Sequence, residues 1–367
     1  MITRPPIKQR LVSEQIRREI IEGQFAPGAQ LPTRTELERR FAVSTITVQR
    51  ALDRLAAEGF IHARGRRGTY VAENPPHLSR YGLVFAHHDS EARPWPRFWT
   101  ALHNEAKRLE QSEPGWEVTI FCDADPHGRS AEAQRLMRSV KAHRLAGLVF
   151  CFQPNWLSGT PALEESGVPR VAITHDSGLP GVTAIKLDTA SLLDRALDVL
   201  AEQGRKRVAM VTVGSIYASA ADRERFHAGL ADRGMSTQPY WYQVLDVNRP
   251  QWARECLHLL MNDGQKHRPD GVIIANDNLV EHASAGLIAA GVRVPEDASI
   301  VAHGNFPWPT PSVLPVTRLG FDAREVLRVC FDSIDAQRRG EAVEPEAERW
   351  VKVKFENELD SADIRAG

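Results

Sequence analysis

Residues Val43–Val71 read VSTITVQRALDRLAAEGFIHARGRRGTYV, and this stretch predicts a helix followed by a short β-hairpin. Ser44 is a good helix N-cap, and Val43 can pack against Val48 as a hydrophobic staple around it. The helix has an apolar stripe at helical spacing, formed by Val48, Ala51, Leu52 and Leu55. Gly59 suits the end of this helix, because glycine accepts the left-handed backbone that is common there.

The hairpin has two short apolar runs, residues 60–63 and 69–72, around the turn RGRRG. Glycines permit the bend, and three arginines stand at its tip, where they can reach phosphates or a minor groove. On the preceding helix, Thr45 and Gln49 lie four residues apart and away from the apolar stripe, so both can face outward. Polar side chains at such positions can read base edges in a major groove. Double-stranded DNA is therefore the expected partner.

Two further helices are expected upstream. Residues 8–22 carry apolar side chains at roughly helical spacing, and Gly23 can end that segment. Thr33 and Glu36 form a capping-box pattern at the start of the second helix, where each side chain can satisfy a free backbone amide. Three helices and a basic hairpin form a winged helix-turn-helix.

The charge distribution agrees with this assignment. The whole chain of 367 residues has a net charge of −1. Residues 1–72 carry a net charge of +6, and the remainder carries −7. A basic head on an acidic body indicates that the head contacts a polyanion.

The first 72 residues resemble the GntR family of bacterial regulators. The match runs through Ile21-Glu22-Gly23, Pro27-Gly28, Leu31-Pro32, Leu37, Val43-Ser44, Thr47-Val48, Ala51-Leu52, Leu55, Glu58-Gly59 and Gly68-Thr69-Tyr70-Val71. By this resemblance, the DNA-binding residues are Arg34, Thr35, Ser44, Thr45, Thr47, Gln49, Arg50, Gly65, Arg66, Arg67 and Gly68. Thr45 and Gln49 replace arginines that the family often has. Because arginine favours guanine and glutamine favours adenine, the operator need not follow the commonest family sequence.

The remaining sequence alternates strands and helices after a polar, proline-containing linker at residues 73–79. Strands are expected at Tyr81–Ala86, Glu117–Cys122, Ala146–Phe152, Arg170–Thr174, Arg207–Val213, Gly271–Ala275 and Ala298–Ala302. The helical segments between them include Phe98–Glu110, Ala131–His143, Thr189–Gln203, Arg223–Gly234, Trp252–Leu260 and Leu279–Ala290. This rhythm predicts an α/β body of parallel sheets in two lobes.

Ligands of open α/β sheets bind beyond the carboxyl ends of the strands. The residues that follow the expected strands are rich in amide, carboxylate and imidazole groups. They include His88, Asp89, Asp123, Gln153, His175, Asp176, Asn276, Asp277 and Asn305. Such groups can pair with the hydroxyls, amides or ammonium groups of a polar effector. For any single residue, the alternative is that loops are polar in any case.

Residues 80–358 resemble the effector domain of LacI/GalR regulators, which share the periplasmic-binding-protein fold. The resemblance is carried by Ala146-Gly147-Leu148-Val149, Gly167-Val168-Pro169, Asp188, residues 204–209, Arg223 to Gly229, Pro269-Asp270-Gly271, Ala275-Asn276-Asp277, Gly291, Val294-Pro295-Glu296-Asp297 and Pro315-Val316-Thr317. It implies a sugar or related effector, a homodimer, and lobe crossings near 187, 309 and 339. It also implies that Arg223, or alternatively Arg225, and Asn276 contact the effector.

One departure from that family lies at His303-Gly304-Asn305. The family usually has glycine, an aromatic residue and a sugar-binding aspartate there. Gly304 occupies the aspartate position in this chain, and Asn305 follows it. A standard sugar pose is therefore not expected.

Several other classes are not expected. The sequence has no nucleophile elbow, Walker loop or His-Glu-x-x-His motif, so we expect no enzyme, no cofactor and no metal. The four cysteines are far apart, and no apolar run is long enough to span a membrane. Together these features predict a cytoplasmic, ligand-responsive transcription regulator, most simply a repressor. The alternative is a ligand-binding or scaffold protein whose head lacks specific DNA readout.

Overall fold

The three-dimensional structure is a computed structural model that describes residues 7–90, 95–112, 117–174, 178–214, 219–341 and 349–359. Its contacts divide the chain into two compact units. The first comprises residues 1–87, 107–184 and 330–347, and the second comprises residues 88–106, 185–329 and 348–367. Within the described ranges, no helix is both long and apolar enough to cross a membrane.

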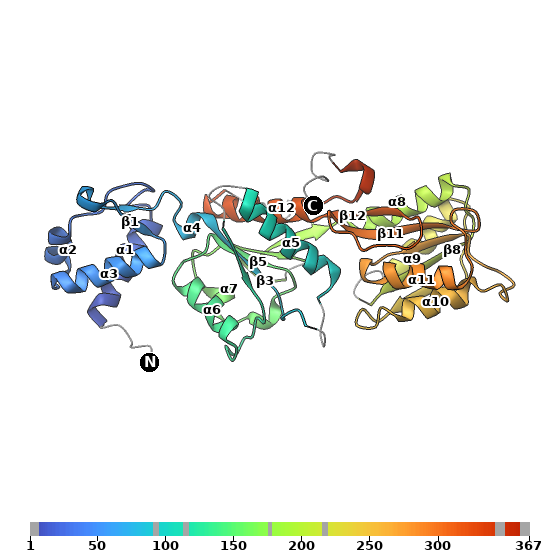
Figure 1. Ribbon diagram of the computed structural model, residues 1–367, viewed down its shortest axis with the longest axis horizontal. Helices are drawn as coiled ribbons and strands as arrows, with labels where there is room; N and C mark the ends of the chain where they lie inside the picture. The colour runs from blue at the N-terminus through green and yellow to red at the C-terminus, as the bar shows by residue number, and fades with distance from the viewer. Residues whose placement is uncertain are drawn as a thin grey trace. The chain divides into compact units, whose positions relative to one another are not determined.

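The head contains the three expected helices and the hairpin (Figure 1). Its elements are α1 (Ile7–Ile21), α2 (Arg34–Phe41), α3 (Thr45–Ala57), β1 (Ile61–Ala63) and β2 (Thr69–Val71). The capping box of Thr33 and Glu36 is confirmed, as is Ser44 as the N-cap of α3. Strands β1 and β2 pair in antiparallel register, with Ile61 opposite Val71. A single apolar cluster, which includes Ile16, Leu37, Val48, Leu55 and Phe60, holds the helices against the hairpin.

The first strand of a six-stranded sheet lies in the first unit. This strand directly follows a short helix within the linker, α4 (Pro76–Ser79). Its strands are β3 (Arg80–Val84), β4 (Glu117–Phe121), β5 (Gly147–Phe150), β6 (Arg170–Ile173), β7 (Thr183–Leu187) and β13 (Arg349–Val351), in the order β13-β7-β6-β5-β3-β4. Side chains of α6 (Ala131–Lys141) and α7 (Pro161–Glu164) cover one face. On the other face, Tyr81 stacks on Phe331 of α12 (Ala323–Arg338).

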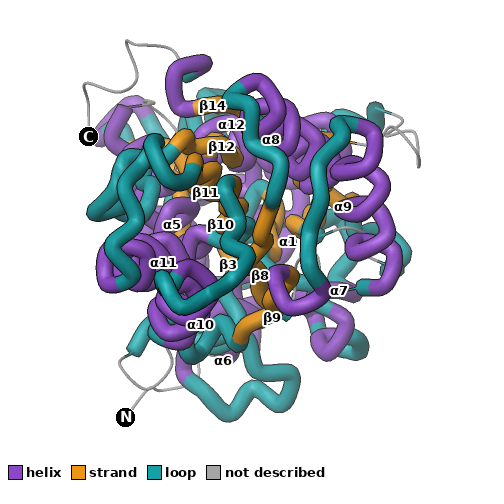
Figure 2. The backbone as a smooth tube through the Cα atoms, turned by 90° about the vertical axis from the view of Figure 1, so that its right-hand side faces the viewer, coloured by secondary structure: helices purple, strands orange, loops and turns teal. Residues whose placement is uncertain are grey.

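The second unit contains another six-stranded sheet, in the order β14-β12-β11-β10-β8-β9 (Figure 2). Its strands are β8 (Val208–Val213), β9 (Tyr242–Leu245), β10 (Gly271–Ile274), β11 (Ser299–Phe306), β12 (Thr317–Asp322) and β14 (Lys354–Phe355). All its pairs are parallel except that of β12 with β14. Of the predicted fold class, the α/β character and the two parallel-type sheets are therefore confirmed.

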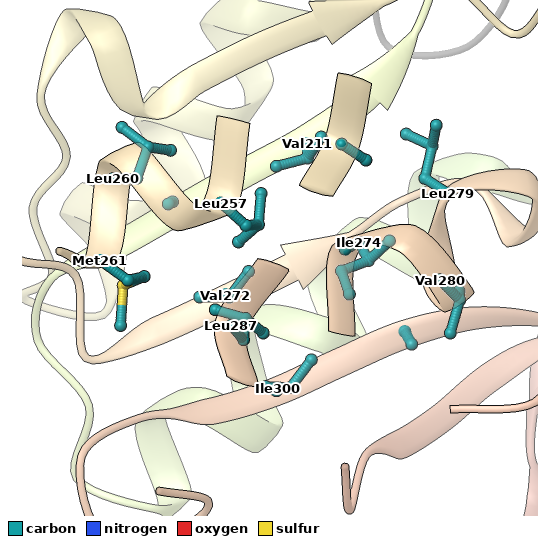
Figure 3. Close-up of a cluster of buried hydrophobic side chains, with 14 of the residues drawn as sticks. Val211, Leu257, Leu260, Met261, Val272, Ile274, Leu279, Val280, Leu287 and Ile300 are labelled. Atoms are coloured by element: carbon teal, nitrogen blue, oxygen red, sulfur yellow. The ribbon is translucent and has the colours of Figure 1, made fainter. Parts of the chain in front are cut away.

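Helices lie on both faces of this second sheet. They are α8 (Thr189–Glu202), α9 (Ala220–Asp232), α10 (Trp252–Met261) and α11 (Val280–Ala289). Figure 3 shows Leu257 of α10 and Leu287 of α11 packed beside Val272 and Ile274 of β10. Gly271 and Ile273 alternate with these two residues along the strand and face the opposite side of the sheet. On that side, Gly271 lies against Leu200 of α8. Alternation along β10 thus assigns one face to α10 and α11, and the other to α8.

Two expectations about this part of the chain were wrong. Strand β11 continues to Phe306 instead of ending at Ala302, because it pairs with β12 as far as the Phe306–Asp322 register. The expected lobe crossing near 309 is absent, since β11 and β12 are neighbours in one sheet. The proline-rich loop between them resembles a linker in sequence but connects adjacent strands. The chain instead leaves this sheet between β12 and β13 and returns between β13 and β14.

Candidate DNA-binding surface and ligand pocket

The N-terminal turn of α3 exposes the residues expected to read bases. Ser44, Thr45 and Arg50 are exposed, while Thr47 and Gln49 are half-buried. The Gln49 amide donates to Asp53 at 2.6 Å, so it must leave that carboxylate to reach a base. Ile46 is 65% exposed in the same turn, and the sequence prediction omitted it. An isoleucine outside the apolar stripe, one residue after a polar contact position, is the signal that could have revealed it.

The first turn of α2 supplies Arg34 and Thr35, and both are exposed. Their position follows from the capping box, because Thr33 holds the helix start immediately before them. The free amides and positive dipole end of such a turn suit a phosphate group. The predicted residues Arg34, Thr35, Ser44, Thr45 and Thr47 thus lie at the starts of α2 and α3, whereas Gln49 and Arg50 lie in the next turn of α3.

The tip of the wing is a short 3-10 turn over Gly65–Arg67. Gly65 and Gly68 have φ of 58° and 109°, which explains why glycine stands at both positions. The Tyr70 hydroxyl donates to the Arg67 carbonyl at 3.0 Å, and the exposed Arg67 side chain belongs to this anchored turn. The Arg64 guanidinium lies 4.9 Å from the Tyr70 ring centroid. The Arg66 side chain lies outside the described part of the structure.

A cavity of about 200 Å³ lies in the second unit, next to the end of β10 and along β11. Most of its lining is aromatic or aliphatic. The lining residues are Pro96, Phe98, Trp99, Leu187, Thr189, Leu192, Val247, Ala275, Asn276, Asp277, Asn278, His303, Asn305 and Phe321. We call this cavity the β10–β11 pocket.

The polar wall of the β10–β11 pocket is built around Asp277, which is almost fully buried. One of its carboxylate oxygens accepts from the Asn305 side-chain amide at 3.0 Å, and the other accepts from the Thr310 backbone amide at 3.1 Å. Asn276 caps the following turn by accepting from the Asn278 backbone amide at 3.1 Å. A buried carboxylate needs such partners, because desolvation without them is costly.

His303 and Asn305 line the pocket together because they are two residues apart on β11 and face the same side. Burial lowers the pKa of His303, and the nearby Asp277 charge opposes that effect only in part. The imidazole is therefore neutral at neutral pH. Neither His303 Nδ1 nor Asn305 Oδ1, both buried, has a hydrogen-bond partner among the described residues.

The pocket brings together three of the predicted effector residues, namely Asn276, Asp277 and Asn305. Within the same unit, His88, Asp89 and Arg223 lie outside its lining. Asp89 accepts from the Trp95 backbone amide at 2.8 Å, and the Arg223 guanidinium lies 5.1 Å from the Tyr242 ring centroid.

The other predicted effector residues belong to the first unit. Asp123 is half-buried with φ of 57°, and Gln153 is exposed. His175 and Asp176 lie outside the described residues. The sequence prediction omitted His303, Trp99 and Phe321, which the structure places in the lining.

Comparison with known proteins assigns both parts of the chain. Residues 8–71 match the model of the gntR family of bacterial regulatory proteins, and residues 197–355 match that of the periplasmic binding protein-like domain. An arabinose metabolism transcriptional repressor of Halalkalibacterium halodurans is 23% identical over 89% of this chain and 89% of its own. The HTH-type transcriptional regulator GntR of Pseudomonas aeruginosa is 27% identical over 75% of this chain and 80% of its own.

A solved structure shares the fold of the body. The LacI transcriptional regulator from a Rhodococcus species superimposes with a TM-score of 0.57, at 22% identity, over 75% of this chain and 96% of that one. These matches agree with the helix-turn-helix head and with the two parallel-type sheets. The chain is therefore a DNA-binding transcription regulator whose head matches the gntR family and whose body matches the periplasmic binding protein-like domain.

Proposed function

We propose that this regulator is a homodimeric cytoplasmic repressor whose operator affinity changes when a small sugar or related polyol binds in the β10–β11 pocket. The observation that carries the proposal is the pocket itself, in which aromatic rings surround a few buried polar groups. Sites of this composition are typical of small-molecule ligands. The arabinose repressors among the relatives make a sugar the first class to test.

The proposed response follows from linkage. A ligand changes DNA affinity only if it binds one conformation of the protein more tightly than another, and the effect is reciprocal. Two heads on a dimer would bind two half-sites, so a change in their spacing would alter affinity for the whole operator. No enzymatic role belongs to this proposal.

The test begins with selection of duplexes from a random DNA library by the full-length protein. Binding of the selected duplex is then measured by fluorescence anisotropy, with and without L-arabinose, D-ribose, D-xylose, D-glucose and D-galactose. We expect at least one sugar to change the DNA dissociation constant by about fivefold or more, within the usual range of allosteric coupling.

Two variants serve as controls. The Thr45→Ala/Gln49→Ala variant should bind the selected duplex weakly in every condition. Asn276→Ala should bind it normally but respond less to the sugar. Enrichment of no duplex at all would favour the alternative of a ligand-binding or scaffold protein without DNA readout.

A further inference from the structure

A second cavity, of about 750 Å³, lies within the first unit, where the head meets the helices of the first sheet. One wall is formed by the C-terminal parts of α1 and α3, and the other by the end of α6 and the loop after α7. The lining residues are Glu14, Arg17, Arg18, Ile21, Glu22, Arg54, Glu58, Arg138, Lys141, Ala142, His143, Arg144, Glu165, Ser166 and Gly167. We call it the junction cavity, and it shares no lining residue with the β10–β11 pocket.

Cations outnumber carboxylates in the lining of the junction cavity. Six of its residues are arginine or lysine, and four are glutamate. Glu58 pairs with both Arg17 and Arg54, so one carboxylate serves two of these cations. The other four cations form no ion pair with any described residue, and they are Arg18, Arg138, Lys141 and Arg144.

Helix ends account for only part of this excess. The C-terminus of a helix carries about half a negative charge, which a lysine or arginine in the last turn offsets. Arg18 has this position in α1, whereas α6 has both Arg138 and Lys141 in its last turn. Arg144 stands beyond the end of α6, after His143 with its φ of 47°. The junction cavity therefore has more positive charge than the helices around it require.

Arg144 shows the consequence of this crowding. Its side chain is half-buried, and burial lowers the pKa of its guanidinium. The Glu58 carboxylate opposes that effect. Three neighbouring cations act in the same direction as burial, and they are Arg17, Arg80 and Arg54. An anion nearby would stabilise a cation that is partly desolvated and surrounded by like charges.

The side chains that a ligand would meet are accessible. Arg18 on one wall, and Arg138 and Lys141 on the other, are all exposed. Because a single exposed ion pair contributes little, a singly charged anion would gain too little to bind. A phosphate group carries up to two charges and several acceptor oxygens, so a compound with two phosphates can engage all three side chains. The volume lies within the roughly 300–1,000 Å³ that is typical of small-molecule sites.

We propose that the junction cavity binds a small compound with two or more phosphate groups, which joins Arg18 of the head to Arg138 and Lys141 of α6. This site is separate from the effector site of the proposed function, and neither proposal depends on the other. Because the two walls come from the head and from the helices of the first sheet, the bound compound would restrict movement of the head.

The first test is isothermal titration calorimetry of the full-length protein at constant pH and ionic strength. The phosphate compounds are inorganic pyrophosphate, ADP and D-glucose 1,6-bisphosphate, and acetate is the singly charged probe. We expect at least one phosphate compound to bind once per chain, and at least about tenfold more tightly than acetate. The tighter of ADP and D-glucose 1,6-bisphosphate identifies the carrier of the phosphate groups. Binding of none of the three, or equally tight binding of acetate, would overturn the inference.

The second test locates the site with variants at exposed positions, which should melt like the wild type. Arg138→Ala/Lys141→Ala should weaken binding of the phosphate compound by about tenfold, and Arg18→Ala by about threefold, as expected for the loss of exposed ion pairs. The matched control is Arg34→Ala/Arg67→Ala, which removes the same charge from the DNA-binding surface and should bind like the wild type. If the control loses binding while Arg138→Ala/Lys141→Ala retains it, the anion occupies the DNA-binding surface and the inference is wrong.

The third test asks whether the bound compound joins the two walls. Hydrogen exchange of the full-length protein is compared with and without a saturating amount of the phosphate compound that binds. Exchange should slow both in the last turn of α1 and in residues 142–146 after α6, while α2 should not change. Slower exchange on one wall alone would contradict the bridging arrangement, and so would slower exchange confined to α2.

Discussion

Arg17 of α1 and Glu58 at the C-terminal end of α3 form an ion pair that is nearly shielded from water, with side chains 7% and 10% exposed. Glu58 also accepts from Arg54 of α3 at 3.0 Å, and the Arg17 guanidinium lies 5.6 Å from the Phe60 ring centroid. This pair ties the end of the recognition helix to the first helix of the head. The orientation of α3 therefore depends on two residues far apart in the sequence.

Removal of Glu58 should leave the buried Arg17 guanidinium without a carboxylate partner. Glu58→Ala is expected to destabilise the head by about 3–5 kcal/mol, whereas an Arg17→Met/Glu58→Leu double variant should remain close to the wild type. Hydrogen exchange of the α3 amides in the full-length protein measures this. The control is Arg10→Ala, which breaks the exposed Arg10–Glu14 pair on the same helix and should cost less than about 1 kcal/mol. Equal effects of Arg10→Ala and Glu58→Ala would contradict the assignment.

The exposed turn of α3 should carry base readout. Thr45→Ala and Gln49→Ala are each expected to weaken binding to the selected duplex by about 1–3 kcal/mol and to relax specificity at one base position. Ile46→Ala should weaken binding only where the duplex places a thymine methyl beside it. Anisotropy with single-base variants of the duplex measures both effects. Gln24→Ala, in an exposed turn after α1, should change nothing, and a similar loss there would argue against this surface.

The wing should contribute affinity without sequence preference. Because Arg67 is exposed on an anchored turn, Arg67→Ala should weaken binding to selected and random duplexes alike. Loss of one phosphate contact should reduce the slope of log affinity against log salt by about 0.9. A salt titration of the variant beside the wild type measures the slope. An unchanged slope would place Arg67 away from the DNA.

His77 should make the protein less stable in mild acid. Its ring stacks on Phe60 at 5.8 Å between centroids, and burial lowers its pKa to about 4. The unfolded chain, with a pKa near 6.5, therefore binds more protons between these two values, so stability falls as the pH falls through this window. The loss from pH 7 to pH 5 should be about 2 kcal/mol.

The matched variant for this effect is His77→Phe, which keeps an aromatic ring against Phe60 but cannot titrate. Urea unfolding at pH 7 and pH 5 compares the two proteins, and the wild type should lose more stability than the variant. Parallel losses in both proteins would show that His77 is not responsible.

The sequence was sufficient for the head because its signals are local. A capping box spans three residues, an apolar stripe repeats every three or four, and a wing needs glycines at its bend. The α/β rhythm of the body was readable for the same reason, since buried central strands are continuous apolar runs. Edge and short strands such as β9, β13 and β14 lack that signal, because only part of their surface is buried.

Local sequence signals were not sufficient to predict which residues line the ligand pocket. Asn276, Asp277 and Asn305 could be proposed from their places near strand ends, but the role of His303 could not. His303 and Asn305 share a face only because β11 is extended by pairing with β12. Asp277 is held by Thr310, 33 residues further along the chain. The sequence alone thus determined the DNA-binding head and the α/β class of the body, while long-range strand pairing and hydrogen bonding decided which polar groups are buried together in the pocket.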